Sequence, residues 1–267
     1  MVRDITLGQY YPIESLIHKL DPRTKIWITF GFVISLFLGK NLYLYGLATV
    51  VLLVYVLLAR IPWSYLLRGL KPLVLVVLLS SIFNLFFTEG EAILTIGKLT
   101  ITWQGLRLSC YVIARLLYLI IGSAILTYTT TPTKLADAVE AMLGWMNKFH
   151  VPVHEIAMMI SIAIRFIPIL VEELDKIMKT QQARGAQFDE GNLFVRLKSM
   201  SVVIIPLFVS AIRRANDLAM AMEARCYRGG EGRTKMKPLK YGKTDIAVYG
   251  ILLLYLAVTI YLAFFIK

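Results

Sequence analysis

Two arginines at the ends of predicted helices are the residues in this sequence best suited to bind a partner. Ala183-Arg184-Gly185 closes one polar-faced segment, and Ala224-Arg225-Cys226 closes a second segment 41 positions later. A guanidinium carries five fixed donors and a permanent charge, and it is weakly hydrated for a cation. It therefore suits a groove lined with carbonyl or carboxylate oxygens. The small residues beside each arginine would allow the backbone to approach such a groove closely.

Each arginine also continues an apolar stripe of its predicted helix, because steps of three and four residues fall on one helical face. The first stripe consists of Leu174, Ile177, Gln181, Arg184 and Phe188, and the second of Ala211, Ala215, Leu218, Met222 and Arg225. The alternative is that both triplets are ordinary helix C-termini, where a cation followed by a glycine offsets the helix dipole. The presence of two copies favours docking motifs.

Motifs for nucleotide or metal binding are absent from the sequence. It contains no Gly-x-x-x-x-Gly-Lys-Ser/Thr loop, so we do not expect this chain to bind ATP itself. His150 and His154 are four apart, but Pro152 interrupts the helix that would align them, and no third ligand is near. Cys110 and Cys226 provide neither a disulfide framework nor a metal-binding spacing. We expect no metal and no cofactor on this chain.

One acidic cluster could in principle serve as general acid and base. Glu172, Glu173 and Asp175 lie together, but Lys176 and Lys179 follow Glu172 and Asp175 at the i+4 positions. This spacing is typical of a salt-bridged face exposed to solvent. We therefore predict that the chain is not an enzyme.

Composition places these motifs in a membrane protein. Hydrophobic residues make up 58% of the chain and the mean hydropathy is +0.68. The 29 Lys and Arg outnumber the 17 Asp and Glu, but they lie between apolar runs, which indicates membrane topology and not nucleic-acid binding. We predict an all-α, polytopic membrane protein with about five transmembrane helices and long cytoplasmic helices.

The predicted spans are five apolar runs separated by polar breaks. They cover residues 25–39, 42–59, 73–87, 108–128 and 246–266. Asp21 and Pro22 form a typical start for the first helix. Residues 98–103 alternate in polarity, a pattern that fits either a short strand or a re-entrant turn.

The positive charges predict the orientation of these spans. With the N-terminus inside, 24 of the 29 Lys and Arg lie on the inner side and four on the outer side. The C-terminus is then extracytoplasmic. The remaining arginine, Arg115, lies within the fourth span near one end, where we expect its side chain to snorkel toward the interface.

Residues 129–244 form the unusual part of the chain. Thr131 and Pro132 begin an amphipathic helix that Pro152 ends, and two long helices follow over 153–182 and from 193 to about 227. Hydropathy alone would permit spans at 153–171 and 193–211, but that arrangement would put Arg184 outside the cell. We therefore predict three regions: a membrane domain at 1–128, a cytoplasmic domain at 129–244, which ends in a basic linker, and a final span at 245–267.

Three residues of the first long helix are predicted to support its ending. Pro168 removes a backbone donor and should kink the helix where the apolar part gives way to the charged part. Arg165 is expected to pair with Glu172 across that kink. We assign Arg165, Pro168 and Glu172 a structural role.

These motifs resemble a known family. Arg165-Phe166-Ile167-Pro168 with Glu172, Gln182-Ala183-Arg184-Gly185 and Glu223-Ala224-Arg225-Cys226-Tyr227 are similar to the pattern of the transmembrane T component of energy-coupling factor (ECF) transporters, the EcfT and cobalt-permease CbiQ family. The resemblance covers most of the chain. It departs at Cys226, where glycine is more usual, and this makes a tight backbone turn there less expected.

The resemblance implies a complex of this chain with two P-loop ATPases of the EcfA type, expected to be a heterodimer, and a membrane-embedded S component that captures a vitamin or metal ion. ATP and Mg²⁺ would bind to the ATPases. Ala183, Arg184 and Gly185 would contact one ATPase, and Ala224, Arg225 and Cys226 the other. The surface offered to the S component would include Met158, Met159, Ile160, Val203 and Ile204.

Two other classes of membrane protein fit the sequence less well. The permease subunit of a conventional ABC importer would itself form the substrate path and would carry one coupling loop per chain, whereas this chain has two coupling motifs. A membrane enzyme such as a prenyltransferase would need an Asp-rich metal motif, which the sequence lacks. The T-component interpretation accounts best for both arginine triplets.

Overall fold

The computed structural model describes residues 10–39, 41–96, 99–186, 193–229, 236 and 238–265. Phe188 of the first stripe, residues 230–235 and 237 of the basic linker and the first nine residues lie outside this range. The chain divides into two compact units. We call residues 8–138 with 239–267 the membrane unit and residues 139–238 the crossed-helix unit.

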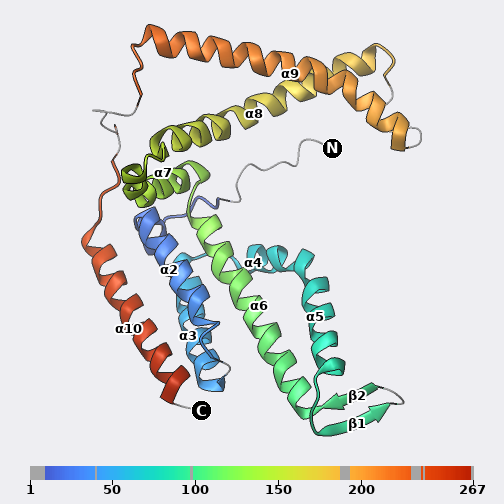
Figure 1. The fold of residues 1–267 in the computed structure, drawn as a ribbon, viewed down its shortest axis with the longest axis vertical. Helices are drawn as coiled ribbons and strands as arrows, with labels where there is room; N and C mark the ends of the chain where they lie inside the picture. Colours follow the sequence, from blue (N-terminus) through green and yellow to red (C-terminus); the bar gives the residue numbers. More distant parts are fainter. Residues whose placement is uncertain are drawn as a thin grey trace. The chain divides into compact units, whose positions relative to one another are not determined.

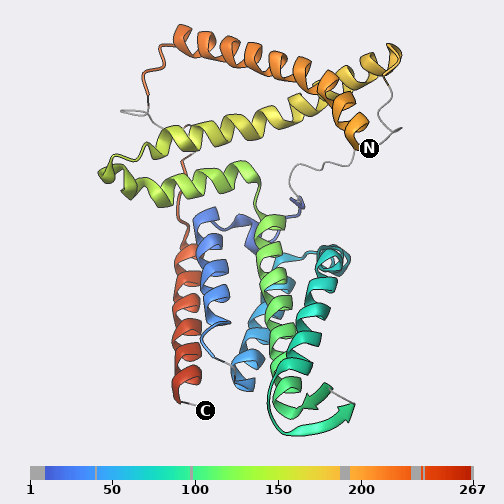
Figure 2. The same cartoon turned by 45° about the vertical axis from the view of Figure 1, so that its right-hand side comes forward.

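The membrane unit is built from helices that connect the apolar runs (Figures 1 and 2). They are α1 Leu16–Lys19, α2 Pro22–Ser35, α3 Leu42–Ala59, α4 Trp63–Leu70, the 3-10 turn Lys71–Leu73, α5 Val74–Phe87, α6 Trp103–Thr129 and α10 Lys243–Phe265. Within the described residues α3, α6 and α10 of this unit are long and apolar enough to cross a membrane. They correspond to the predicted spans 42–59, 108–128 and 246–266.

The other two predicted spans form shorter helices. α5 is apolar, but its 14 residues are fewer than a membrane span needs. α2 also has 14 residues, because Leu36 is its C-cap. The predicted start of α2 is confirmed, since Pro22 is its first residue and the Asp21 carboxylate accepts a hydrogen bond from the Arg23 backbone N–H at 2.9 Å. Apolarity therefore located these segments, but their helical length is shorter than a full span.

A β-hairpin joins α5 to α6 (Figure 1). Strand β1 Ala92–Ile96 pairs antiparallel with β2 Leu99–Thr102, and the register shifts between Ala92 and Leu94. Of the two structures that the alternating segment 98–103 fits, the short strand is therefore the one that forms, as β2.

Arg115 differs from its prediction. Because α6 begins at Trp103, Arg115 lies near the middle of this helix and not near its end. Its Nε donates to the Tyr45 hydroxyl at 3.0 Å, and its guanidinium lies 5.1 Å from the centre of the Phe37 ring. The charge is thus held by protein aromatic groups, and the expected snorkelling is wrong.

Polar contacts tie the start of α10 to the start of α2. One Asp245 carboxylate oxygen accepts from the Asp21 backbone N–H at 2.9 Å, and the other accepts from the Gly242 N–H at 2.7 Å. Arg23 pairs with the Asp21 carboxylate and stacks 4.0 Å from the centre of the Tyr241 ring. These contacts fix the last helix of the chain against the first long one.

The crossed-helix unit contains the two long helices predicted from the sequence. α7 Pro132–Leu143 begins in the membrane unit and enters the crossed-helix unit at Val139. It leads through a 3-10 segment, Gly144–Phe149, to α8 Val153–Ala183, and α9 Leu193–Ala224 follows. Figures 1 and 2 show that α9 runs back across α8 in the opposite direction. α8 also has the length and composition of a membrane span, so its predicted cytoplasmic position stays a prediction.

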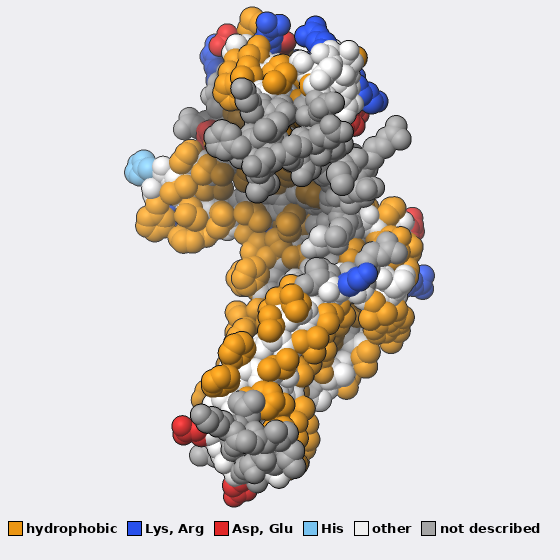
Figure 3. Space-filling model, turned by 90° about the vertical axis from the view of Figure 1, so that its right-hand side faces the viewer, with side chains coloured by type: hydrophobic (Ala, Val, Ile, Leu, Met, Phe, Trp, Pro, Cys, Tyr) orange, Lys and Arg blue, Asp and Glu red, His pale blue; other side chains and the backbone are white. Residues whose placement is uncertain are grey.

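Surface character differs between the parts of the chain. Figure 3 shows Lys and Arg side chains gathered over the crossed helices, and a largely hydrophobic face over the helices of the membrane unit. Leu57, Leu253 and Leu254, for example, are between 65% and 68% exposed. Such a surface is stable only when lipid or another protein covers it.

Candidate partner-binding site

The first arginine triplet forms a complete Schellman cap at the end of α8. Arg184 is the C-cap residue, and Gly185 follows with a left-handed φ of +90°. The Gly185 N–H donates to the Gln182 carbonyl at 2.9 Å, and the Ala186 N–H donates to the Gln181 carbonyl at 3.0 Å. These two bonds satisfy carbonyls that a helix end otherwise leaves free.

The second triplet repeats this geometry at the end of α9. Cys226 occupies the position of Gly185, with a φ of +57°. Its N–H donates to the Glu223 carbonyl at 2.8 Å, and the Tyr227 N–H donates to the Met222 carbonyl at 3.0 Å. The tight turn therefore forms although cysteine replaces glycine. A side chain in the left-handed region costs about 1–2 kcal/mol, which the cap compensates.

The caps explain the small residues but not the arginines. Backbone groups alone close both caps, and within the described part of the chain neither Arg184 nor Arg225 has a side-chain hydrogen bond or ion pair. All six residues of the triplets are exposed. The backbone turns present two guanidiniums to the surroundings of the chain, and a favourable interaction with the helix dipole needs no such repeated triplet.

An ion pair joins the two helices at equivalent positions. Arg214 of α9 donates to the Glu173 carboxylate of α8 at 3.1 Å. Glu173 lies 11 residues before Arg184, and Arg214 lies 11 residues before Arg225. Because α8 and α9 run in opposite directions, the two caps lie at opposite ends of the crossed pair (Figures 1 and 2).

A cavity of about 480 Å³ lies beside the second cap. It is bounded by the beginning of α8 and the end of α9, and its lining consists of Met158, Ile162, Leu218, Met222, Arg225, Cys226, Tyr227, Arg228 and Gly229. Leu218, Met222 and Arg225 belong to the second predicted stripe. This stripe therefore faces a hollow next to α8, with the arginine at its end.

The predicted ion pair that would support the first cap does not form: among the described residues Arg165 makes no ion pair with Glu172. Seven residues separate their Cα atoms by roughly 10 Å along a helix, which is too far for a direct pair. The neighbouring Glu173 pairs instead, with α9. α8 continues through Pro168, and the predicted kink there stays a prediction. Arg165, Pro168 and Glu172 are all exposed.

The residues predicted to face an S component divide by exposure. Met159, Ile160 and Ile204 are exposed, at 58%, 44% and 58% respectively, and Met158 is half-buried beside the cavity. Val203 is only 5% exposed, so it supports the α9 packing in this structure and offers no surface. The exposed three are the members of this set available to a partner.

Sequence reasoning missed the Glu173–Arg214 contact, although a signal was present. These two residues are separated by the same 41 positions as the two capping arginines. It also missed the hydrogen bond between His154 Nδ1 and the Glu140 carboxylate, 3.0 Å long, which joins α7 to α8. Neither contact has a local motif that would reveal it.

Comparison with known proteins places these features in a family. Residues 14–236 match the CbiQ family, described as cobalt transport protein. The chain belongs to this family. It is 50% identical over 256 residues to the energy-coupling factor transporter transmembrane protein EcfT of Ruminiclostridium cellulolyticum, a match that covers 96% of each chain.

Two further relatives carry the same name. The EcfT protein of Thermosediminibacter oceani is 48% identical over 248 residues, covering 93% of this chain and 94% of its own, and that of Bacillus subtilis is 44% identical over 249 residues with the same coverage. The resemblance predicted from the arginine motifs is confirmed. The chain is a membrane-embedded transmembrane component of the EcfT/CbiQ type.

Proposed function

We propose that this chain transmits the ATP-driven closure of two ATPase subunits to a substrate-binding S component in an ECF importer of vitamins or other micronutrients. The observation that carries the proposal is the repeated cap, which presents Arg184 and Arg225 at opposite ends of an antiparallel helix pair, each without a side-chain partner among the described residues. Two docking groups, one at each end of the crossed helices, fit two similar partner subunits.

The arginines would act as the docking groups. A guanidinium seated in a groove of acidic or carbonyl oxygens forms fixed, charge-assisted hydrogen bonds. Exposed Ala183 and Ala224 leave room for the partner backbone beside each cap. Arg184 would meet one ATPase and Arg225 the other, and ATP with Mg²⁺ would bind to these partners.

The crossing would convert closure into movement of the helices. The Glu173–Arg214 pair is 11 residues from each capping arginine, about 16 Å along each helix. When the ATPases approach one another, the two arms would rotate about this crossing by similar amounts. The exposed apolar residues Met159, Ile160 and Ile204 would then change the surface offered to the S component.

The orientation of the chain follows the charge distribution. With 24 Lys and Arg on the side of the N-terminus and the crossed helices, that side would be cytoplasmic and the C-terminus extracytoplasmic. Cytosolic ATPases could then reach both caps.

A pull-down of the tagged chain from its native membrane tests the proposal. We compare wild type with the Arg184→Glu, Arg225→Glu double variant, and we use Lys179→Glu, Arg213→Glu as a control with the same change of charge on exposed residues of the same helices. Reversing a charge in a desolvated groove costs several kcal/mol. Two ATPases and a small membrane protein should accompany wild type and the control, and the ATPases should be lost from the double variant.

Other outcomes distinguish the alternative. If the arginine double variant recovers as much ATPase as the control variant does, the arginines do not bind the ATPases and only offset the helix dipole. Recovery of ATPases without any small membrane protein, together with direct binding of a transported solute by the purified chain, would establish a conventional permease subunit.

A further inference from the structure

The crossed-helix unit is a continuous segment, residues 139–238, so the chain joins it to the membrane unit at two points. The first point lies in α7, which begins shortly after α6 ends at Thr129. The second point lies just before α10, which begins at Lys243. The end of α6 and the start of α10 are both hydrogen-bonded to residues 21–25, at the beginning of α2.

Lys25 holds the end of α6. Its side chain is only 2% exposed, and its Nζ donates to the Thr129 carbonyl at 2.9 Å and to the His18 carbonyl at 3.3 Å. Carbonyls in the last turn of a helix have no partner within the helix, and a cation beside them interacts favourably with the helix dipole. A buried ammonium needs such acceptors, so this side chain links α6 to α2.

A backbone contact strengthens the hold on α6. The Tyr11 N–H donates to the Tyr128 carbonyl at 2.9 Å. His18 fixes this part of the chain, since its Nε2 is hydrogen-bonded to the Tyr11 carbonyl at 3.0 Å and its Nδ1 to the Ser15 hydroxyl at 2.7 Å. Residues 11–25 therefore hold the last two carbonyls of α6.

Asp245 holds the start of α10. It is 3% exposed, and one carboxylate oxygen accepts from the Gly242 N–H at 2.7 Å while the other accepts from the Asp21 N–H at 2.9 Å. A carboxylate in the first turn of a helix also interacts favourably with the helix dipole. The positive charge of Lys25 and the negative charge of Asp245 attract each other. The two held helix ends thus meet at the same few residues of α2.

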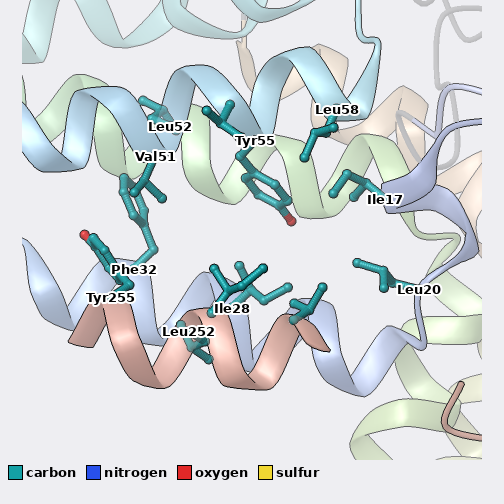
Figure 4. Close-up of a pocket in the computed structure, with 13 residues that line it drawn as sticks. Ile17, Leu20, Ile28, Phe32, Val51, Leu52, Tyr55, Leu58, Leu252 and Tyr255 are labelled. Atoms are coloured by element: carbon teal, nitrogen blue, oxygen red, sulfur yellow. The ribbon is translucent and has the colours of Figure 1, made fainter. Parts of the chain in front are cut away.

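Apolar packing continues the contact between α2 and α10. The Phe32 and Tyr255 rings stack with their centres 6.4 Å apart, and the Tyr255 hydroxyl is hydrogen-bonded to the Ser35 hydroxyl at 2.6 Å. Figure 4 shows the two rings next to each other, at the edge of an apolar cavity of about 190 Å³. This packing would keep α10 beside α2 even when the polar contacts at its start are removed.

We infer that Lys25 and Asp245 are positioning residues, which hold both attachments of the crossed-helix unit at the beginning of α2. The inference rests on the proposed function and deepens it. When the ATPases close, fixed attachments would confine the movement to the rotation of α8 and α9, whereas free attachments would separate and absorb part of it. Both residues are buried, so they act through the helix ends that they hold.

Electron paramagnetic resonance of the full-length chain in lipid nanodiscs tests the hold without any partner. Spin labels are placed at Lys134→Cys, in the first turn of α7, and at Lys243→Cys, the first residue of α10, in a Cys110→Ser, Cys226→Ser background. Both labelled positions are exposed. The distance between the labels should have one narrow distribution when both attachments are held.

The double variant Lys25→Met, Asp245→Ala should broaden this distribution. Methionine has a similar length and no charge to bury, so the chain should remain folded, which its unfolding temperature checks. Lys19→Met, Glu91→Ala is the matched control: it removes one exposed lysine and one exposed glutamate of the same unit and should keep the distribution narrow. Asp245→Asn retains an oxygen for the Asp21 N–H and should broaden it less than Asp245→Ala. The same distribution in the double variant and the control would overturn the assignment.

The assembled transporter in proteoliposomes tests the consequence for transport. The double variant should bind the ATPases and hydrolyse ATP, but it should take up several-fold less substrate per ATP hydrolysed than wild type or the control. An unchanged ratio of uptake to hydrolysis, despite a broadened distance distribution, would overturn the positioning role. Failure of wild type to bind ATPases would instead overturn the proposed function, and the distance distribution would still decide whether Lys25 and Asp245 hold the attachments.

Discussion

Glu173 and Arg214 join α8 and α9 at the same distance from their capping arginines. The ion pair is 3.1 Å long, and each member lies 11 residues before the arginine that ends its helix. The two long helices are therefore paired about equivalent points although they run in opposite directions. This arrangement gives the unit two arms of equal length, as the proposed transmission of movement requires.

The first prediction concerns this pair. The side chain of Arg214 is 39% exposed and that of Glu173 is 25% exposed, so solvent screens the attraction between them. We therefore expect a coupling energy of about 1 kcal/mol or less. Glu173→Gln and Arg214→Gln should each lower the unfolding temperature slightly and reduce transport more strongly, because the crossing loses its fixed point. The charge-exchanged protein, Glu173→Arg with Arg214→Glu, should regain part of both properties.

A double-mutant cycle of thermal unfolding and of ATP-dependent uptake measures these effects. Glu172→Gln is the matched control, since Glu172 is exposed and makes no ion pair with Arg165. If this control reduces uptake as much as Glu173→Gln does, the effect belongs to the acidic surface and not to the crossing.

The second prediction concerns the two caps. Cys226→Gly should stabilise the chain by about 0.5–1 kcal/mol, because glycine adopts the left-handed conformation without steric cost but loses more entropy on folding. Gly185→Ala should destabilise it by about 1 kcal/mol for the opposite reason. Cys226→Ala should have little effect, since one side chain replaces another at the same φ. Thermal unfolding of the purified chain measures the stability of all three variants. If Cys226→Gly and Cys226→Ala change the stability equally, the left-handed conformation of Cys226 is not strained.

Much of the fold was accessible from the sequence because it depends on local patterns. The uninterrupted apolar run 42–59 is α3, and the Asp21-Pro22 signal marks the start of α2. Arg115 was misjudged because its environment depends on Tyr45, which lies 70 residues away. The Arg165–Glu172 pair was wrong because seven residues along one helix separate them by roughly 10 Å. The pairing of the neighbouring Glu173 with Arg214 of α9 has no signal within either segment alone.

The same distinction holds for the candidate site. The repeat of the triplets revealed where the arginines would be presented, since each belongs to a helix end with its own local signal. That Cys226 adopts the left-handed turn depends on the hydrogen bonds of the whole cap, which compensate the cost of its side chain. The cavity beside Arg225 depends on Met158 and Ile162 of the other helix, and no pattern in α9 specifies them.

The third prediction concerns the pH dependence of stability. Burial lowers the pKa of His18 below 6.5, and the positive charge of Lys25 acts in the same direction, although the hydrogen bond to the Tyr11 carbonyl opposes them. The neutral ring is therefore favoured in the folded chain. Well above pH 6.5 the His18 ring is neutral in both the folded and the unfolded chain, so its contribution to the free energy of unfolding is fully present. As the pH falls through 6.5, the unfolded chain binds the proton more readily than the folded chain, and the free energy of unfolding decreases.

Unfolding temperatures at pH 7.5 and 5.5 measure this effect. The difference between the two values should be larger for wild type than for His18→Gln, which cannot bind the proton. An identical difference in both proteins would assign the acid sensitivity to other groups.

The last prediction follows from the equal arms of the crossed helices. Spin labels near the two caps, at Lys179→Cys and Glu223→Cys in a Cys110→Ser, Cys226→Ser background, should report a change of distance when ATP closes the assembled transporter, because in the proposed function the two ends bind different ATPases. Labels on α8 and α9 near the crossing, at Glu172→Cys and Arg213→Cys, should report little change, because the Glu173–Arg214 contact holds the helices together there. Electron paramagnetic resonance measures both pairs. Equal changes at the caps and at the crossing would show that the helices slide past one another and do not rotate about a fixed point.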